Sequence, residues 1–335
     1  MNQTLSNGAV YKKVLGFSIR RLVFSIIFIA MIAGLSYGGF LLGKKLFHFN
    51  GAPLVGMGVG AVIAIVLVAI IAHFFMYVIK AGQIAVIMKA VTEDKIPDNP
   101  WQTGKSMVKE RFGTVALYYA ATSIIKGIFG EIGHAITKIG EAIGGDSGSA
   151  IGSAISIVIN TIVNYLCDCC LGWVFYRKDQ NAFKATCEGA VTFFKHGKTF
   201  LKNMGRVFGI GLASLIVIGG AFFGIFYLIA LQFPHYIQVL AIEIKKLSEG
   251  TEPNKVISIL SNETALTIAI AAVGALIIWS IIHSTFVKPF VLVGVLRNYM
   301  NTAIENIPAP SEFDVLEKNS KKYRKYKQEH ASDLQ

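Results

Sequence analysis

The chain has 335 residues, of which 53% are hydrophobic and only 16% charged, and its mean hydropathy is +0.56. Soluble globular proteins usually carry about 25% charged residues. The composition therefore excludes a soluble enzyme, a disordered chain and a secreted disulfide scaffold. We interpret the net charge of +12 as the excess of lysine and arginine in the cytoplasmic loops of a membrane protein, and we expect no nucleic-acid partner.

Three uncharged stretches are each longer than the roughly 20 residues that an α-helix needs to cross the hydrocarbon core of a bilayer. They are Leu22–Gly43, Ala52–Ile79 and Val207–Phe233. Continuous apolar runs also exclude a β-barrel, whose strands of about 10 residues alternate between polar and apolar side chains. The sequence therefore predicts an all-α fold, a polytopic membrane helical bundle.

Six crossings are expected in chain order. The third is the weakest, with only 14 uncharged residues, and is predicted to be short or tilted. The second is predicted to continue as a helix to about Thr92. The six predicted crossings are Leu22–Gly43, Leu54–Ile79, Phe112–Ile125, Ile151–Tyr176, Val207–Phe233 and Ala265–Val287.

The distribution of lysine and arginine predicts the orientation. With six crossings and a cytoplasmic N-terminus, 25 of these residues lie in cytoplasmic segments and 7 lie in outside loops. This asymmetry follows the positive-inside rule. We expect a multi-pass protein of the cell (inner) membrane with both termini in the cytoplasm. Residues 1–310 are predicted to form a single transmembrane domain, and residues 311–335 a charged cytoplasmic tail.

Two amphipathic helices are predicted to lie at the membrane surface. One spans residues 124–143 on the outside, and the other, Phe183–Met204, carries lysines on one side and apolar residues on the other. This pattern is typical of a helix in the interface, and its basic side suits the anionic lipids of the inner leaflet. Membrane lipids are therefore expected partners.

A polar stripe is predicted on the fourth crossing. Asn160, Asn164 and Asp168 recur every four residues, so they share one face of the helix. A charged residue facing lipid costs several kcal/mol, so it normally faces a cavity or a partner. One interpretation is a hydrated pathway in which Asp168 attracts a cation. The alternative is that Asp168 pairs with Arg177 or Lys178 at the cytoplasmic interface, and that the asparagines form interhelical hydrogen bonds.

Other chemistry-bearing residues give weaker patterns. His73 and His283 lie inside the second and sixth crossings, where each is interpreted either as a proton-relay group or as a neutral, hydrogen-bonded residue. Cys167 and Cys170 have the spacing of half a zinc site, but no second compact pair follows. No nucleophile, base and orienting group occur together. We therefore expect no enzymatic activity, no cofactor and no metal site.

Small residues are expected where helices pack closely. Gly56, Gly58 and Gly60 lie inside the second crossing. Their spacing is only superficially that of a dinucleotide-binding loop, and in a membrane helix such residues let a neighbouring backbone approach. The sequence therefore predicts close helix packing at this position.

About 40 residues resemble a known family. A cysteine-rich helix end is followed by an Asn-Ala-aromatic segment and then by an Asn-x-x-Arg-Val segment that enters the next crossing; these pieces are Cys169-Cys170-Leu171, Gln180–Thr186, Lys198-Thr199-Phe200 and Asn203–Val207. This pattern resembles the choline transporter-like family of solute carriers. The resemblance implies transport of choline or a related organic cation, with proton exchange.

The function expected from the sequence is that of an integral membrane transporter-like protein for a small organic cation. The alternative is a non-transporting scaffold that organises the membrane or a protein complex. The polar stripe favours transport, whereas the basic interfacial helices fit either function. A homo-oligomer is compatible with both.

Overall fold

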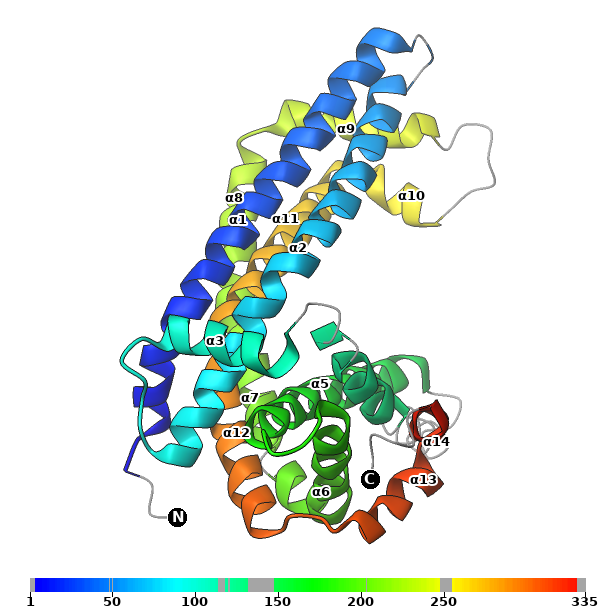
Figure 1. Cartoon of the computed structure of the whole chain (residues 1–335). Coiled ribbons are helices and arrows are strands. Elements are labelled where there is room, and N and C mark those ends of the chain that lie inside the picture. The colour runs from blue at the N-terminus through cyan, green and yellow to red at the C-terminus, as the bar shows by residue number, and fades with distance from the viewer. Residues whose placement is uncertain are drawn as a thin grey trace. The chain divides into compact units, whose positions relative to one another are not determined.

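The computed structural model describes residues 4–47, 49, 51–113, 118–119, 121–131, 148–202, 204–247 and 255–329. Every regular element within these ranges is a helix, as Figure 1 illustrates. The predicted all-α class is thereby confirmed. The chain divides into two compact units: unit 1 comprises residues 1–20, 74–208 and 288–335, and unit 2 comprises residues 21–73 and 209–287.

Five helices of the described residues are long and apolar enough to cross a membrane: Asn7–Leu46, Ala52–Ala72, Phe75–Glu93, Gly209–Leu231 and Glu263–Glu305. They differ in how much the protein itself covers them. Within the most apolar window, only 6% of the residues of each of the first two helices are buried, against 61% for Phe75–Glu93. The first two therefore expose their apolar side chains, whereas Phe75–Glu93 contributes to a protein core.

Unit 2 is built from long apolar helices. Its large side chains remain exposed, including Val217 at 69% and Val62 at 61%. Such a surface is stable in hydrocarbon but not in water. The elements are the parts within unit 2 of α1 (Asn7–Leu46), α2 (Ala52–Glu93) and α7 (Met204–Ser214), followed by η2 (Leu215–Gly219), α8 (Gly220–Leu231), α9 (Pro234–Leu247), α10 (Lys255–Leu260), α11 (Glu263–Ile282) and η3 (His283–Val287).

Glycines bring α1 and α2 together in unit 2. A Cβ atom on Gly39 would lie 2.2 Å from the backbone oxygen of Gly56, and one on Gly60 would lie 2.3 Å from that of Leu35. The two backbones thus touch where no side chain fits, as in other glycine-mediated membrane helix pairs. The predicted close packing is confirmed for Gly56 and Gly60, whereas a Cβ on Gly58 would meet nothing within 4 Å.

Unit 1 has a densely packed core. Trp173, Leu296 and Tyr299 are at most 1% exposed, and α6 packs against both α5 and α12. Besides the remaining parts of α1, α2 and α7, its elements are α3 (Pro100–Phe112), α5 (Gly148–Tyr176), α6 (Ala182–Lys202), α12 (Lys288–Glu305), η4 (Pro310–Phe313), α13 (Asp314–Asn319) and α14 (Lys321–Glu329).

The third and fourth predicted crossings fall in unit 1. Residues 114–117 and 120 of the third lie outside the described residues, but Phe112 and Ile125 at its two ends are buried. The fourth corresponds to α5, which is buried from Tyr165 to Phe175. The continuation of the second crossing as a helix to Thr92 is confirmed, because α2 ends only at Glu93.

The helix predicted at the inner leaflet is largely covered by protein. Phe183, Cys187 and Val191 on the apolar side of α6 are at most 7% exposed, as is Phe193. Amphipathicity predicts that one face is covered, but it does not distinguish lipid from a protein neighbour. Residues 132–143 of the other predicted surface helix lie outside the described residues.

The C-terminal helices belong to unit 1. Leu316 and Tyr323 are at most 1% exposed, and the Tyr323 ring stacks on Phe183 at 6.4 Å between centroids. The Glu131 carboxylate accepts a hydrogen bond from the Ser320 hydroxyl at 2.6 Å. Apolar side chains between the charges therefore pack part of the predicted tail, residues 311–335, within unit 1.

Candidate functional site

Two π-helical turns occur in unit 2. The turn η2 begins directly after Ser214, and the turn η3 begins at His283. The helix α11, which continues into η3, packs against η2. Single π-helical turns inside α-helices are rare, and they are frequent at functional sites.

The side chains at these turns form a hydrogen-bonded cluster. The Ser214 Oγ lies 3.0 Å from the Nδ1 of His283 and accepts a hydrogen bond from the Trp279 Nε1 at 3.2 Å. The Trp279 and His283 ring centroids are 5.1 Å apart. We call Ser214, Trp279 and His283 the histidine cluster.

Ser214 also bonds within its own helix. The hydroxyl lies 2.7 Å from the backbone oxygen of Gly211, to which it can donate. A serine has one hydrogen to donate and two lone pairs. With the hydrogen on Gly211, Nδ1 of His283 donates to the hydroxyl; with the hydrogen turned to Nδ1, the hydroxyl donates to the ring.

A positive charge stabilises the second π-helical turn. The Arg21 Nη1 donates to the backbone oxygen of Ser284 at 3.0 Å. The next residue of this turn, Thr285, is fully buried, and its hydroxyl has no hydrogen-bond partner among the described residues. Arg21 thus satisfies a carbonyl in the turn where the backbone departs from the α-helix.

The cluster lies in an apolar part of the chain. Ser214 and His283 belong to the uncharged runs 207–233 and 264–287, and Ser214 is 9% exposed. Polar side chains inside membrane segments are costly, and they generally mark a site or a helix contact. The cluster therefore places an imidazole next to two irregular turns of the backbone.

Asp168 has other partners than expected. Its carboxylate is 3% exposed and forms ion pairs with the ammonium groups of Lys80 at 2.7 Å and Lys288 at 3.0 Å. Of the two interpretations considered above, pairing with cations holds, but the cations are Lys80 and Lys288 and not Arg177 or Lys178. Arg177 and Lys178 are close to Asp168 in sequence. The cations that contact its carboxylate come instead from α2, with Lys80, and from α12, with Lys288.

Arg177 and Lys178 pair elsewhere in unit 1. Arg177 binds the carboxylates of Asp179 and Glu188, each at 2.8 Å, and Lys178 lies 3.2 Å from Glu110. The Trp173 indole also donates to Glu188, at 3.2 Å. These contacts connect the end of α5 to α6.

The other members of the predicted stripe are placed differently from Asp168. Asn160 and Asn164 are exposed on α5, whereas Asp168 is buried. The three residues share the predicted helix face but not one environment. The side chain of His73, the other predicted histidine, lies outside the described residues.

The four cysteines are free thiols in the core. Cys167, Cys169, Cys170 and Cys187 are at most 8% exposed. Within the described ranges, no group of three or more His, Cys, Asp or Glu side chains could hold a metal ion. Burial raises the pKa of the Cys187 thiol on α6 far above its ordinary value, so this thiol is inert.

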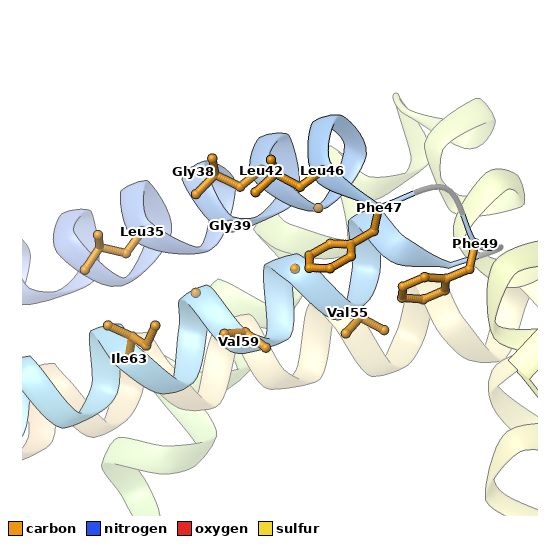
Figure 2. Close-up of a pocket in the computed structure, with 13 residues that line it drawn as sticks. Leu35, Gly38, Gly39, Leu42, Leu46, Phe47, Phe49, Val55, Val59 and Ile63 are labelled. Atoms are coloured by element: carbon orange, nitrogen blue, oxygen red, sulfur yellow. The ribbon is translucent and has the colours of Figure 1, made fainter.

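A groove also runs along the α1–α2 pair of unit 2, with a volume of about 580 Å³. Figure 2 shows Leu35, Leu42, Val59 and Ile63 along it and Phe47 at one end. All its lining residues are apolar side chains or glycines. It offers no group that could bind an ion or exchange a proton.

Sequence reasoning identified His283 but missed its partners. Ser214 and Trp279 are far apart in sequence from one another, and hydroxyl residues are common in membrane helices. The only feature of the sequence that pointed to Ser214 and Trp279 was a polar group inside an apolar run. The π-helical turns have no sequence signature of their own, because the extra residue is accommodated by packing.

No family model matches the chain, and no curated protein or solved structure is similar to it. Two residues that carry the choline transporter-like resemblance, Cys170 and Asn181, have contacts within unit 1. The Cys170 thiol donates to the backbone oxygen of Thr186 at 3.5 Å. The Asn181 side chain accepts from the backbone N–H of Lys184 at 2.7 Å and so caps α6.

Proposed function

We propose that the protein is an integral membrane transporter for a small organic cation and that His283 exchanges the proton that accompanies transport. The observation that carries this proposal is the histidine cluster at the paired π-helical turns η2 and η3. It combines a titratable side chain with irregular backbone inside apolar helices. Both features recur where membrane helices move or bind ions.

Proton binding would change the hydrogen bonds of the cluster. The neutral ring has one donor and one acceptor nitrogen, whereas in the protonated ring both nitrogens donate, so that Nδ1 then donates to Ser214. The bond between Ser214 and His283 links η2 to η3, so a change at the imidazole reaches both turns. The two protonation states therefore favour different arrangements of these helices.

The cluster also fits competition between a proton and an organic cation. The indole face of Trp279 lies beside the imidazole, and an aromatic face attracts a quaternary ammonium by about 0.5–2 kcal/mol. A protonated His283 would repel such a cation, whereas a neutral one would not. The proposal is therefore exchange of one for the other, the direction in which the family resemblance also points.

We further propose a topology with four crossings, all in unit 2. They are the parts of α1 and α2 in unit 2, the series α7–η2–α8 and the series α11–η3. With unit 1 in the cytoplasm, 27 of the 32 lysines and arginines lie on that side, and the remaining five are Lys44, Lys45, Lys245, Lys246 and Lys255. The asymmetry is larger than for six crossings, which favours four.

The cation site originally expected at Asp168 is less favoured. A carboxylate that is neutralised by Lys80 and Lys288 has no excess negative charge with which to attract a cation. The densely packed core of unit 1 favours the scaffold as the second candidate function, because such a domain offers a rigid surface to a partner protein.

The test is transport by the full chain in vesicles. Purified protein is reconstituted with a pH-sensitive dye inside, and uptake of labelled choline, the probe cation, is driven by an outward proton gradient. We expect uptake accompanied by loss of internal protons, and its abolition in His283→Gln, which keeps a hydrogen-bonding side chain but cannot be protonated. His235→Gln, at an exposed position of α9, is the matched control and should transport normally.

Two results contradict the proposal. Uptake that is unchanged in His283→Gln would remove the histidine from the mechanism. Absence of uptake with choline and with tetramethylammonium, in vesicles whose protein is folded by thermal unfolding, would leave the scaffold function as the better explanation.

A further inference from the structure

The buried ion cluster of unit 1 lies where two membrane segments end. Lys80 is the first charged residue after the uncharged run 52–79, and Lys288 is the first after the run 264–287. Asp168 bridges the two ammonium groups at 2.7 and 3.0 Å. A helix rises about 1.5 Å per residue, and an uncharged run of such length covers the hydrocarbon core. Under the proposed topology, both lysines therefore lie near the cytoplasmic headgroups.

The cluster has more positive than negative charge. Among the described residues, Asp168 supplies one carboxylate for the two lysines. Each ammonium group has three hydrogens to donate, and the ion pair with Asp168 occupies one. The side chains of Lys80 and Lys288 remain 38% and 24% exposed, whereas Asp168 is 3% exposed. The carboxylate is thus enclosed while the cations still reach the surface.

Aromatic residues surround the same position. The Tyr77 ring lies 5.2 Å from that of Tyr118 and 6.2 Å from that of Tyr119, between centroids. Tyr77 precedes Lys80 by one helical turn, and the Lys288 ammonium lies 5.4 Å from the ring centroid of Tyr165. Tyrosines are enriched at the depth of lipid headgroups. The tyrosines therefore support a position of Lys80 and Lys288 at the depth of the lipid headgroups.

We infer that Lys80 and Lys288 form a binding site for the phosphate of an anionic phospholipid in the cytoplasmic leaflet. Asp168 is a positioning residue whose enclosed carboxylate holds the two ammonium groups, while their exposed sides can donate to a phosphate at the surface. A phosphate accepts several charge-assisted hydrogen bonds, which ammonium donors supply. The inference uses the proposed topology but is independent of transport through the histidine cluster.

The test measures the thermal stabilisation of the purified full chain by lipid. Short-chain phosphatidylglycerol is the probe, phosphatidylcholine of the same chain length is the zwitterionic arm, and inorganic phosphate at equal ionic strength is the free-phosphate arm. We expect phosphatidylglycerol alone to raise the unfolding temperature in a saturable manner.

Variants assign the effect to the site. The triple variant Lys80→Gln, Asp168→Asn, Lys288→Gln removes the charges together, so that no buried charge is left alone. We expect its apparent affinity for phosphatidylglycerol to fall at least about fivefold, corresponding to about 1 kcal/mol for one net positive charge at the membrane surface. Lys80→Arg with Lys288→Arg keeps the charges and should retain binding. Lys105→Gln, at an exposed position of α3, is the matched control.

Three results would overturn the inference. They are equal stabilisation by phosphatidylcholine, equal stabilisation by inorganic phosphate, and wild-type affinity in the triple variant. If the triple variant does not fold, Lys80→Gln alone replaces it, because Lys288 still pairs with Asp168 there, and the same fall in affinity is required.

Discussion

Ser214 and His283 each adjoin a π-helical turn, and their side chains meet with 3.0 Å between Oγ and Nδ1. The hydrogen bond therefore joins two places, among the described residues of unit 2, where the backbone departs from the α-helix. Single π-helical turns are frequent at functional sites. Under the proposed function, protonation of His283 would act on both turns.

Ser214→Ala should destabilise the protein without altering the apolar packing of unit 2. It removes the hydroxyl that accepts from Trp279 and shares a hydrogen bond with His283. We expect the free energy of unfolding to fall by about 1–2 kcal/mol, because a hydrogen bond between membrane helices contributes about 0.6 kcal/mol on average and about 1.7 at most. Thermal unfolding in detergent measures the change. Ser280→Ala, at an exposed position of α11, should have no effect, and an equal loss there would contradict the prediction.

Two glycines of α1 should respond to alanine in opposite directions. A Cβ atom on Gly39 would lie 2.2 Å from the Gly56 backbone oxygen, whereas one on Gly34 would meet nothing within 4 Å. We expect Gly39→Ala to lose about 1–3 kcal/mol through overpacking. Gly34→Ala should gain about 0.5–1 kcal/mol, since glycine is unfavourable in a helix interior. Unfolding temperatures of the two variants measure this, and a similar change in both would show that the glycine contact is unimportant.

Stability should depend on pH through Glu188 on α6. Burial raises the pKa of this carboxyl above its ordinary value of 4.5, and Arg177 opposes the shift. A raised pKa means that the neutral carboxyl favours the folded state, fully below pH 4.5, and that this contribution is lost as the pH rises through the raised pKa. Unfolding temperatures between pH 4 and pH 8 should therefore fall less in Glu188→Gln than in wild type. Glu110→Gln, at a carboxylate that is 61% exposed, should follow wild type; a wild-type slope in Glu188→Gln would refute the assignment.

Labelling can distinguish four crossings from six. The native thiols are buried, so a cysteine introduced at an exposed position reports its own side of the membrane. With four crossings, Ser106→Cys and Lys126→Cys should both react from the cytoplasmic side with a membrane-impermeant maleimide. With six crossings, residues 112–125 would separate them and Lys126→Cys would react from outside. Lys45→Cys, which lies outside in both topologies, is the control for orientation.

The membrane helices themselves could be predicted from the sequence. Uncharged runs longer than a bilayer core and the distribution of lysine and arginine are properties of local composition, and α1, α2 and α11 lie where these runs predict them. The glycines that bring α1 and α2 together were also recognisable. In each case the physical cause, transfer of apolar side chains out of water or close backbone approach, acts over a few helical turns.

Partners distant in the chain could not be predicted in this way. The sequence suggested Arg177 or Lys178 for Asp168 because they are nearby, but α2 and α12 supply Lys80 and Lys288. Similarly, the pattern of α6 showed that one face must be covered without showing that protein covers it. An apolar face is equally stable against lipid and against a packed core, so the choice depends on the neighbouring helices.

The sequence by itself thus determined that the chain is helical and where it can enter a membrane, because hydrophobicity and charge act locally. The tertiary structure decided which buried charges neutralise one another and which polar groups meet inside apolar helices. It alone places Ser214 beside His283 and forms the π-helical turns next to them. These features depend on how whole helices pack, and packing geometry is a property of the assembled chain rather than of any one segment.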